Sequence, residues 1–343
     1  MEKICILGAG SWGTAQAILL SENAATVFIW GRPEDEIDSI NIDRENRRFL
    51  PGVKIPANVE ATTSLSKAMH NAVLVVLAVP SQVLRRVLGD AALYLTRSMY
   101  IVNTAKGLEI STGMRMSQVV EDVLGSEIRE RYAVLSGPSH AEEVARGVPT
   151  AVTVAAYRKN TAFFIQDVYM SPVFRVYTNP DVAGVELGGA LKNIVALATG
   201  MADGLGYGDN TKAALITRGL TEMARMGEAL GGDPRSFSGL SGVGDLVVTC
   251  NSRYSRNRRA GIMVGRGCSL EETLIEIGMV VEGVYTTKVV YGIACELGID
   301  MPITEACYRI LYEKRPPQEE VNALMKRKKK HEIEEIAKDI KGW

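Results

Sequence analysis

The sequence has few aromatic residues and almost no net charge. Phenylalanine, tryptophan and tyrosine make up 6% of the 343 residues, and 39 lysines and arginines are balanced by 40 aspartates and glutamates. The balanced charge argues against electrostatic attraction of the whole protein to nucleic acid or to a membrane surface. The low aromatic content argues against a base-stacking surface. A local anion-binding site is compatible with both observations.

Cysteine and histidine are too few and too scattered for a disulfide framework or a metal centre. The five cysteines are an odd number, and no two of them have the CxxC spacing of a thiolate zinc site. The three histidines are far apart, and none is placed like a catalytic base. We therefore expect reduced thiols and no bound metal. The residues concerned are Cys5, Cys250, Cys268, Cys295, Cys307, His70, His140 and His331.

Long apolar runs are absent as well. No window reaches about 18 apolar residues without a charge, so the sequence predicts no membrane span. Glu2 and Lys3 precede a very short apolar run, which is not the pattern of a signal peptide. These observations predict a cytoplasmic protein without membrane insertion.

The first half of the chain alternates short apolar runs with stretches of helical periodicity. Continuous apolar strands separated by helices are typical of a parallel sheet that is covered on both faces. We therefore predict an α/β fold that begins with a Rossmann-type, doubly wound sheet. The predicted strands are 4–7, 27–30, 73–79, 100–103, 134–135 and 151–154, and the first helix covers 14–21.

The second half has a different character, and we predict an all-α C-terminal domain. The turn at 178–180 marks the change, and the length suits two domains. The tail is expected to be a solvated or frayed helix, with partner or lipid-surface binding as the alternative. Helical spacing of apolar residues covers 182–201, 209–230, 269–278, 283–297 and 304–313. The predicted units are a dinucleotide-binding domain at 1–180, a helical substrate and catalytic domain at 181–326, and a basic, amphipathic tail at 327–343.

Gly8, Gly10 and Gly13 form a GxGxxG motif between the first predicted strand and the first predicted helix. Gly8 permits a tight turn, Gly10 lets the backbone approach a pyrophosphate, and Gly13 lets helix and strand pack closely. The helix N-terminus then presents free N–H groups to the phosphates. The motif alone is weak evidence, but its strand–turn–helix context favours dinucleotide binding over a purely structural glycine turn.

The end of the second predicted strand indicates which dinucleotide binds. It reads Trp30, Gly31 and Arg32, without the acidic residue that would bind the ribose of NAD(H). A ribose 2′-phosphate is therefore not repelled, and Arg32 could pair with it. This favours NADP(H) over NAD(H), although Glu34 and Asp35 lie close by in sequence. If Arg32 is only an exposed loop arginine, either cofactor binds.

Polar residues that could contact a substrate follow two later strands. Lys106 stands just beyond a strand end, where ligands bind in open α/β sheets. The alternative is a surface lysine. The loop with Gly137 and Ser139 follows another strand and could offer backbone N–H groups and hydroxyls, or be only a turn.

Lys192 and Asn193 lie within an otherwise apolar helix of glycines and alanines. A lysine there must either reach solvent or be used. Close packing would desolvate its ammonium and lower its pKa, and a second lysine nearby would act in the same direction. A lysine with a pKa near neutrality can exchange a proton with an alcohol or a carbonyl. Asp245, behind three glycines, could accept a hydrogen bond from an ammonium or a substrate hydroxyl, or cap a helix.

Ser255, Arg256 and Asn257 stand at a predicted helix start. Hydroxyl, guanidinium and amide together suit a small phosphate or another anion, and a solvated basic helix is the alternative. With the glycine motif, these residues predict a nicotinamide-dependent oxidoreductase with a lysine acid/base and an anionic substrate. The residue pattern does not identify that substrate.

Six longer motifs follow one another along the chain: GAGSWGTA, NTAKGLE, SGPSHAEEVARGVPTA, GVELGGALKNIVALATGMADGLGYGDN, GLSGVGDLVVTCNSRYSRNRRAG and VVEGVYTTK. In this order the chain resembles the bacterial type of NAD(P)-dependent glycerol-3-phosphate dehydrogenase, from about residue 4 to residue 313. The resemblance implies reduction of dihydroxyacetone phosphate to sn-glycerol 3-phosphate, which supplies the glycerophospholipid backbone.

The resemblance also implies roles for individual residues. Lys192 matches the family's catalytic proton donor and acceptor, with Lys106 and Asp245 beside it. The implied substrate contacts are Lys106, Gly137, Ser139, Lys192, Asp245, Ser255, Arg256 and Asn257, with Asn193 and Thr249 close to the substrate. Besides the glycines, the implied cofactor contacts are Ser11, Trp12, Arg32, Lys106, Ala141, Arg256, Val280 and Glu282.

His140 departs from the family pattern, because an aromatic residue such as phenylalanine is common at this position. It flanks the substrate loop, so we expect a difference in packing there more than in chemistry. Two other classes stay open: a 3-hydroxyacid or ketopantoate-type reductase, and a non-catalytic cofactor sensor with a degenerate site. The segment 255–257 argues against the first, and Lys192 and Asp245 argue against the second. A homodimer is the expected assembly.

Overall fold

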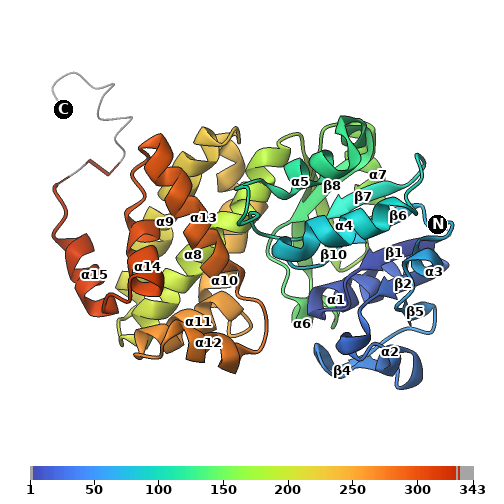
Figure 1. The fold of residues 1–343 in the computed structure, drawn as a ribbon, viewed down its shortest axis with the longest axis horizontal. Coiled ribbons are helices and arrows are strands. Elements are labelled where there is room, and N and C mark those ends of the chain that lie inside the picture. Colours follow the sequence, from blue (N-terminus) through green and yellow to red (C-terminus); the bar gives the residue numbers. More distant parts are fainter. Residues whose placement is uncertain (1–2, 330, 333–343) are drawn as a thin grey trace.

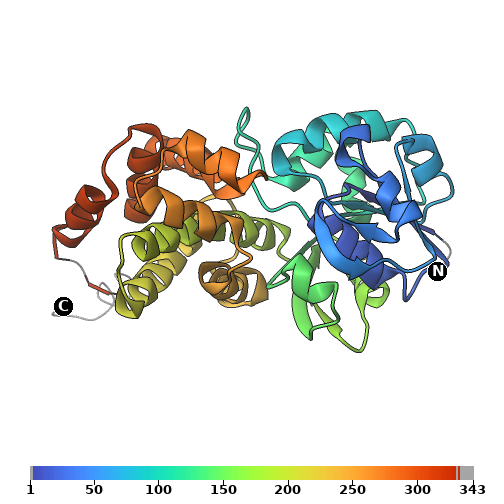
Figure 2. The same cartoon turned by 90° about the horizontal axis from the view of Figure 1, so that it is seen from below.

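The computed structural model describes residues 3–329, 331 and 332. The two halves of the chain lie side by side along the long axis of the molecule, with the N-terminus at the outer end of the sheet domain (Figures 1 and 2). The sheet domain ends with strand β10, Phe174–Asn179, and the helical domain begins with helix α8, Val182–Gly204. The predicted domain bounds at 180 and 326 stay predictions.

An eight-stranded sheet organises the first half, in the order β10-β9-β8-β7-β6-β1-β2-β5. The six strands from β5 to β8 are mutually parallel. Their order follows the doubly wound pattern. After β1, β2 and β5 have been added on one side, β6 returns to the other side of β1, and this change in strand order leaves a crevice for a ligand. The strands are β1 Lys3–Leu7, β2 Thr26–Trp30, β5 Val59–Thr62, β6 Leu74–Leu77, β7 Tyr100–Asn103, β8 Tyr132–Ser136, β9 Thr150–Ala156 and β10 Phe174–Asn179.

One edge of the sheet differs from the expected parallel arrangement. Strand β9 runs antiparallel to β8, with Leu135 opposite Val154, and β10 then pairs parallel with β9. The connection from β8 to β9 contains only the short helix α6, Ala141–Val144, which packs against α1. Strand β10 was not predicted, because its outward-facing residues are polar or aromatic and interrupt the apolar run.

Alternating side chains of the buried strands fill two separate cores. Ile4 and Ile6 of β1 pack with helices α1 and α7 on one face, whereas Cys5 and Leu7 pack with α3, α4 and α5 on the other. This two-residue alternation is what a strand buried on both faces requires. The helices of the sheet domain are α1 Ser11–Leu20, α2 Asp38–Ile42, α3 Leu65–Met69, α4 Leu84–Ala92, α5 Met116–Leu124, α6 Ala141–Val144 and α7 Lys159–Tyr169; a small hairpin pairs β3 Glu45–Asn46 with β4 Leu50–Lys54.

Helix α8 is the centre of the helical domain (Figure 1). It is long and apolar enough to cross a membrane, but 94% of its most apolar window is buried in this fold, as in the core helix of a globular domain. Glycines let α11 approach it closely: a Cβ at Gly200 would lie 2.2 Å from the carbonyl oxygen of Arg258. The surrounding helices are α9 Asp209–Ala229, α10 Asp245–Asn251, α11 Arg256–Gly265, α12 Leu270–Ile277, α13 Glu282–Leu297, α14 Pro302–Tyr312 and α15 Pro317–Met325.

Helix α15 was missed by the sequence analysis. Pro316 and Pro317 suggest an interruption, but Pro317 is the first residue of the helix, where a proline costs no hydrogen bond. The predicted amphipathic tail lies mostly outside the described residues. Within them, the carbonyl oxygen of Glu332 accepts a hydrogen bond from Arg218.

Candidate active site

A cleft of about 880 Å³ lies between the sheet domain and the helical domain. It is lined by the glycine loop, by the ends of β2, β6 and β7, and by residues of α8, α10, α11 and the segment before α13. Of the predicted site residues, only Gly13 and Gly137 do not line it. Those that do are Gly8, Gly10, Ser11, Trp12, Arg32, Lys106, Ser139, Ala141, Lys192, Asn193, Asp245, Thr249, Ser255, Arg256, Asn257, Val280 and Glu282.

The three glycines of the first loop have different surroundings. Gly8 has a φ of +127°, and a Cβ there would lie 2.6 Å from the carbonyl oxygen of Ala78, after the neighbouring strand β6. A Cβ on Gly13 would lie 2.0 Å from the carbonyl oxygen of Gly8, so this glycine is required for packing. A Cβ on Gly10 would meet no atom within 4 Å.

Gly10 therefore borders open space at the start of α1. It is the N-cap residue of this helix and has no side chain to occupy the free N–H groups of the first turn. Unoccupied N–H groups beside open space are suited to a phosphate group. These residues fit the pyrophosphate of a dinucleotide, as the motif predicts.

Arg32 lies at the cleft, but its guanidinium is already paired. It contacts both oxygens of Asp35, at 2.8 Å from Nη2 to Oδ1 and 3.3 Å from Nε to Oδ2. The backbone N–H of Arg32 also donates to Asp35, at 2.9 Å. Burial raises the pKa of Asp35, but the hydrogen bonds from Arg32 outweigh it and the net pKa is below its usual range. An ionised carboxylate therefore stands where the sequence analysis expected an unopposed arginine.

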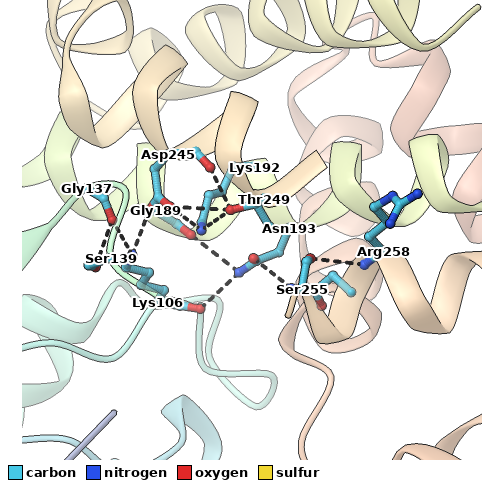
Figure 3. Close-up of polar contacts among 11 residues, drawn as sticks. Lys106, Gly137, Ser139, Gly189, Lys192, Asn193, Asp245, Thr249, Ser255 and Arg258 are labelled. Carbon is cyan, nitrogen blue, oxygen red and sulfur yellow. Dashed lines mark hydrogen bonds and ion pairs between the residues drawn. The ribbon is translucent and has the colours of Figure 1, made fainter. Parts of the chain in front are cut away.

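Two lysines from different domains meet at one buried carboxylate (Figure 3). Lys192 Nζ on α8 donates to Asp245 Oδ1 at 2.5 Å, and Lys106 Nζ, after β7, donates to Asp245 Oδ2 at 2.6 Å. Lys192 also donates to Thr249 Oγ1 at 2.6 Å, and Lys106 to the carbonyl oxygen of Gly137 at 2.9 Å. Asp245 and Thr249 lie one turn apart on α10, so this short helix presents both groups to Lys192.

Burial and charge change the proton affinities of this trio. Burial lowers the pKa of Lys192 to about 8, assisted by the charge of Lys106 and opposed by Asp245. Burial also raises the pKa of Asp245, but the two ammonium groups outweigh it and the net pKa is lowered. Lys192 is 6% exposed and Asp245 is 1% exposed, so solvent screens their interaction little. With a pKa of about 8, Lys192 is mostly protonated at neutral pH, and its proton is bound less tightly than in an ordinary lysine.

A chain of amides continues from the lysines toward α11 (Figure 3). Asn193 Nδ2 donates to the carbonyl oxygen of Lys106 at 3.3 Å, and Asn193 Oδ1 accepts from Asn257 Nδ2 at 2.8 Å. Asn257 Oδ1 in turn accepts from the backbone N–H of Gly283 at 2.9 Å. These bonds fix Asn257 in the first turn of α11, where Ser255 is the N-cap residue and accepts from the backbone N–H of Arg258.

Arg256 is the cationic group of this turn that lines the cleft without a partner among the described residues. Its guanidinium makes no hydrogen bond or ion pair with any of the residues that the structure describes. Burial lowers the pKa of Arg256, and the charges of Glu282 and Glu142 oppose this shift. A half-buried guanidinium at a helix N-terminus, without an ion-pair partner, is suited to an anion such as phosphate.

Glu282 connects the two sides of the cleft. Its carboxylate accepts from the backbone N–H of Ser81 at 3.0 Å and from Ser81 Oγ at 2.6 Å. Burial raises its pKa, although the bonds from Ser81 and the charge of Arg256 lower it. Ser81 was not predicted. The signal was present, because Ser81 follows the end of a buried strand, as Lys106 does.

The loop after β8 supplies the remaining predicted substrate contacts. Gly137 has a φ of +140°, and a Cβ there would lie 2.9 Å from the Cα of Val152, so only glycine fits. Its carbonyl oxygen accepts from Ser139 Oγ at 2.9 Å as well as from Lys106. Ala141 begins α6 and lies at the cleft.

Several cleft residues were not singled out from the sequence as site residues. They include His140, Tyr254 and Arg86. His140 and Tyr254 are chain neighbours of predicted site residues, whereas only the fold brings Arg86 to the cleft. Among the described residues, no group of three or more histidine, cysteine, aspartate or glutamate side chains could hold a metal ion.

Comparisons with known proteins agree with this geometry. Residues 3–162 match the family model described as NAD-dependent glycerol-3-phosphate dehydrogenase N-terminus, and residues 181–322 match the corresponding C-terminus. A glycerol-3-phosphate dehydrogenase (NAD(P)+) of Syntrophomonas wolfei is 67% identical over the whole of both chains, and one of Moorella thermoacetica is 55% identical over 97% of this chain and 98% of its own. A crystal structure of glycerol-3-phosphate dehydrogenase from Coxiella burnetii has a TM-score of 0.90 at 39% identity, covering 95% of this chain and 99% of its own.

Proposed function

The chain belongs to the NAD-dependent glycerol-3-phosphate dehydrogenase family, and from that premise we propose how its cleft carries out the reaction. The reaction is the NAD(P)H-dependent reduction of dihydroxyacetone phosphate to sn-glycerol 3-phosphate. Its product supplies the glycerophospholipid backbone. The contribution of each residue below is the proposed part.

The glycine loop and the first turn of α1 hold the pyrophosphate of the cofactor. The open space beside Gly10 and the free N–H groups of Ser11 and Trp12 support this assignment. When bound, the nicotinamide supplies a hydride to the carbonyl carbon of the substrate. Ala141, Val280 and Glu282 complete the cofactor contacts.

The first turn of α11 holds the substrate phosphate. Arg256 provides an unpaired, half-buried cation, and Ser255 and Asn257 add a hydroxyl and an amide. A phosphate fixed at this point orients the carbonyl group toward Lys192 and Lys106. Gly137 and Ser139 bound the substrate on the side of the sheet domain.

Lys192 delivers the proton to the carbonyl oxygen as charge develops on it. The observation that carries this proposal is the buried contact of 2.5 Å between Lys192 and Asp245, in the same cleft as the glycine loop, and burial lowers the pKa of this lysine to about 8. Lys106 adds a second positive charge that stabilises the developing alkoxide. Asp245 holds both ammonium groups in place, Thr249 accepts a second hydrogen bond from Lys192, and Asn193 holds the backbone carbonyl of Lys106.

A substrate panel tests the proposed function. Oxidation of NADPH and NADH is followed by absorbance with dihydroxyacetone phosphate, dihydroxyacetone and ketopantoate. We expect turnover with the phosphorylated ketone and at most trace activity with the other two, because only the phosphorylated ketone has a phosphate that Arg256 can bind. Turnover of ketopantoate in preference would point to the alternative reductase, and cofactor binding without any turnover would point to a sensor.

We also propose a homodimer in the cytoplasm, without nucleic-acid or membrane partners. The balanced charge of the chain and the burial of its single long apolar helix among the described residues support the second part. Light scattering after size-exclusion chromatography tests the first part. A monomer over the working concentration range would contradict it.

A further inference from the structure

His140 is a cleft residue to which the proposed reaction assigns no role. It is the N-cap residue of α6, and its side chain lines the same cleft as Lys106, Lys192 and Asp245. The three charged groups are close enough to influence its proton affinity. On its other side the ring of Tyr254 lies 6.1 Å away, centroid to centroid. The imidazole is therefore enclosed next to the reacting groups.

The imidazole is neutral and incompletely paired. Burial lowers the pKa of His140 to about 4, with a further contribution from the charge of Lys192. A neutral imidazole has one N–H donor and one nitrogen that only accepts. A hydrogen bond with the backbone of Val248 raises the pKa of the ring, but by less than burial lowers it. The buried Nε2 makes no hydrogen bond to any residue that the structure describes. A buried polar atom without a protein partner indicates a bound ligand or an ordered water molecule.

The carboxylate and carbonyl acceptors around the lysines already have donors, and besides His140 Nε2 only the buried hydroxyl of Ser136, near the Lys106 side chain, has no partner among the described residues. Asp245 Oδ1 and Oδ2 accept from Lys192 and Lys106, and the carbonyl oxygen of Gly137 accepts from Lys106 and Ser139.

The same holds along the amide chain. Asn193 Oδ1 accepts from Asn257, and Asn257 Oδ1 accepts from Gly283. Because the lysines and Arg256 are donors only, the cleft offers many donors to a ligand and few free acceptors.

We propose that His140 is a substrate-binding residue, whose neutral imidazole accepts a hydrogen bond from the free hydroxyl of the substrate, directly or through one bound water molecule. The inference rests on the proposed function, since dihydroxyacetone phosphate carries one free hydroxyl that must donate to an acceptor when it is desolvated. His140 thereby distinguishes a hydroxyl from a methyl group at that end of the substrate.

The test compares dihydroxyacetone phosphate with hydroxyacetone phosphate, which has a methyl group in place of the free hydroxymethyl group. His140→Phe keeps a ring but removes the acceptor, and His140→Gln restores an acceptor oxygen. His70→Phe makes the same change at an exposed position away from the cleft. For each variant, kcat/KM is measured with both substrates, and NADPH binding is measured by fluorescence as a check on folding.

The expected result is a change in selectivity. His140→Phe lowers kcat/KM for dihydroxyacetone phosphate about tenfold and for the methyl analogue by less than about threefold, as expected for one lost hydrogen bond. His140→Gln recovers part of the loss, and His70→Phe leaves the ratio of the two substrates unchanged. Equal losses with both substrates, or no loss with either, would overturn the proposal.

The parent enzyme provides an independent check if His140→Phe fails to bind NADPH. The proposal requires the parent to prefer dihydroxyacetone phosphate over the methyl analogue by about tenfold or more. Equal turnover of the two substrates would contradict it without any variant. Failure of the parent to reduce either substrate would instead contradict the proposed function.

Discussion

The two sides of the cleft use different parts of the chain: backbone groups on the side of the sheet domain and charged side chains on the side of the helical domain. On the side of the sheet domain, open space beside Gly10 and free backbone N–H groups form the site, and the close contacts of Gly8 and Gly13 hold the loop in place. On the side of the helical domain, the site consists of buried charges, with Lys192 and Asp245 in contact at 2.5 Å. The first side requires the absence of side chains, whereas the second requires particular ones.

This difference assigns cofactor binding to the side of the sheet domain and proton transfer to the side of the helical domain. Backbone N–H groups can hold a phosphate but have no proton to exchange near neutral pH, whereas a buried lysine can exchange one. Variants of the helical side should therefore change the rate, and variants of the glycine loop should change cofactor affinity or stability.

The largest expected effect comes from Lys192. Lys192→Gln retains a polar side chain of similar length but removes the proton donor, and we expect kcat to fall about 10³-fold. The dissociation constant of NADPH, measured by fluorescence titration, should stay within about threefold of that of the parent because the glycine loop is unaffected.

Lys159→Gln is the matched control, since Lys159 is exposed on α7, outside the cleft. It should change neither quantity. A Lys192→Gln enzyme that retains kcat within a few-fold of the parent would show that another group donates the proton.

Two alanine substitutions in the glycine loop test the side of the cleft that the sheet domain forms. Gly13→Ala places a Cβ 2.0 Å from the carbonyl oxygen of Gly8, and we expect the free energy of unfolding without cofactor to fall by about 3 kcal/mol. Gly10→Ala meets no protein atom within 4 Å and should leave that stability unchanged while weakening NADPH binding about tenfold or more. Denaturant titration and fluorescence titration measure the two effects. Equal loss of stability in both variants would contradict the assignment of Gly10 to the pyrophosphate.

The smallest expected effect concerns the choice between NADPH and NADH. Asp35→Asn removes the carboxylate that holds Arg32, so the guanidinium can turn to a ribose 2′-phosphate and a repelling charge is lost. We expect the ratio of NADPH affinity to NADH affinity to rise about three- to tenfold, because the Arg32 side chain is 54% exposed and solvent weakens the pair. Asp38→Asn, in the nearby helix α2, is the control. An unchanged ratio would mean that Asp35 does not influence the ribose site.

The same contrast explains how much could be predicted from the sequence. The glycine motif is local, so the motif and its strand–turn–helix context could be predicted from the sequence, and the structure places it between β1 and α1 as expected. The fold class is confirmed, but the edge strands β5 and β10 were missed, because exposed residues interrupt their apolar runs. The antiparallel direction of β9 was missed as well, because strand direction depends on how the connections run and cannot be read from an apolar run.

The charged side of the cleft was predictable only in part. Lys106 and Asp245 are 139 residues apart, and no spacing rule brings them together. Lys192 could be singled out because a lysine is unusual in an apolar helix, and the roles of the other charged residues came from the family resemblance. The pairing of Arg32 with Asp35 was missed because it depends on a turn at 33–35 that folds the carboxylate back over the end of β2.

The measurement that tests this account most directly is the pH dependence of kcat/KM for dihydroxyacetone phosphate reduction, followed by NADPH absorbance from about pH 6 to about pH 10. Lys192 must be protonated to act, and burial sets its pKa at about 8. The account predicts a plateau below pH 8 and a fall of about tenfold per pH unit above it, which Lys192→Gln abolishes together with most of the activity. A rate that stays constant or rises between about pH 8 and about pH 10 would contradict proton transfer from the buried lysine.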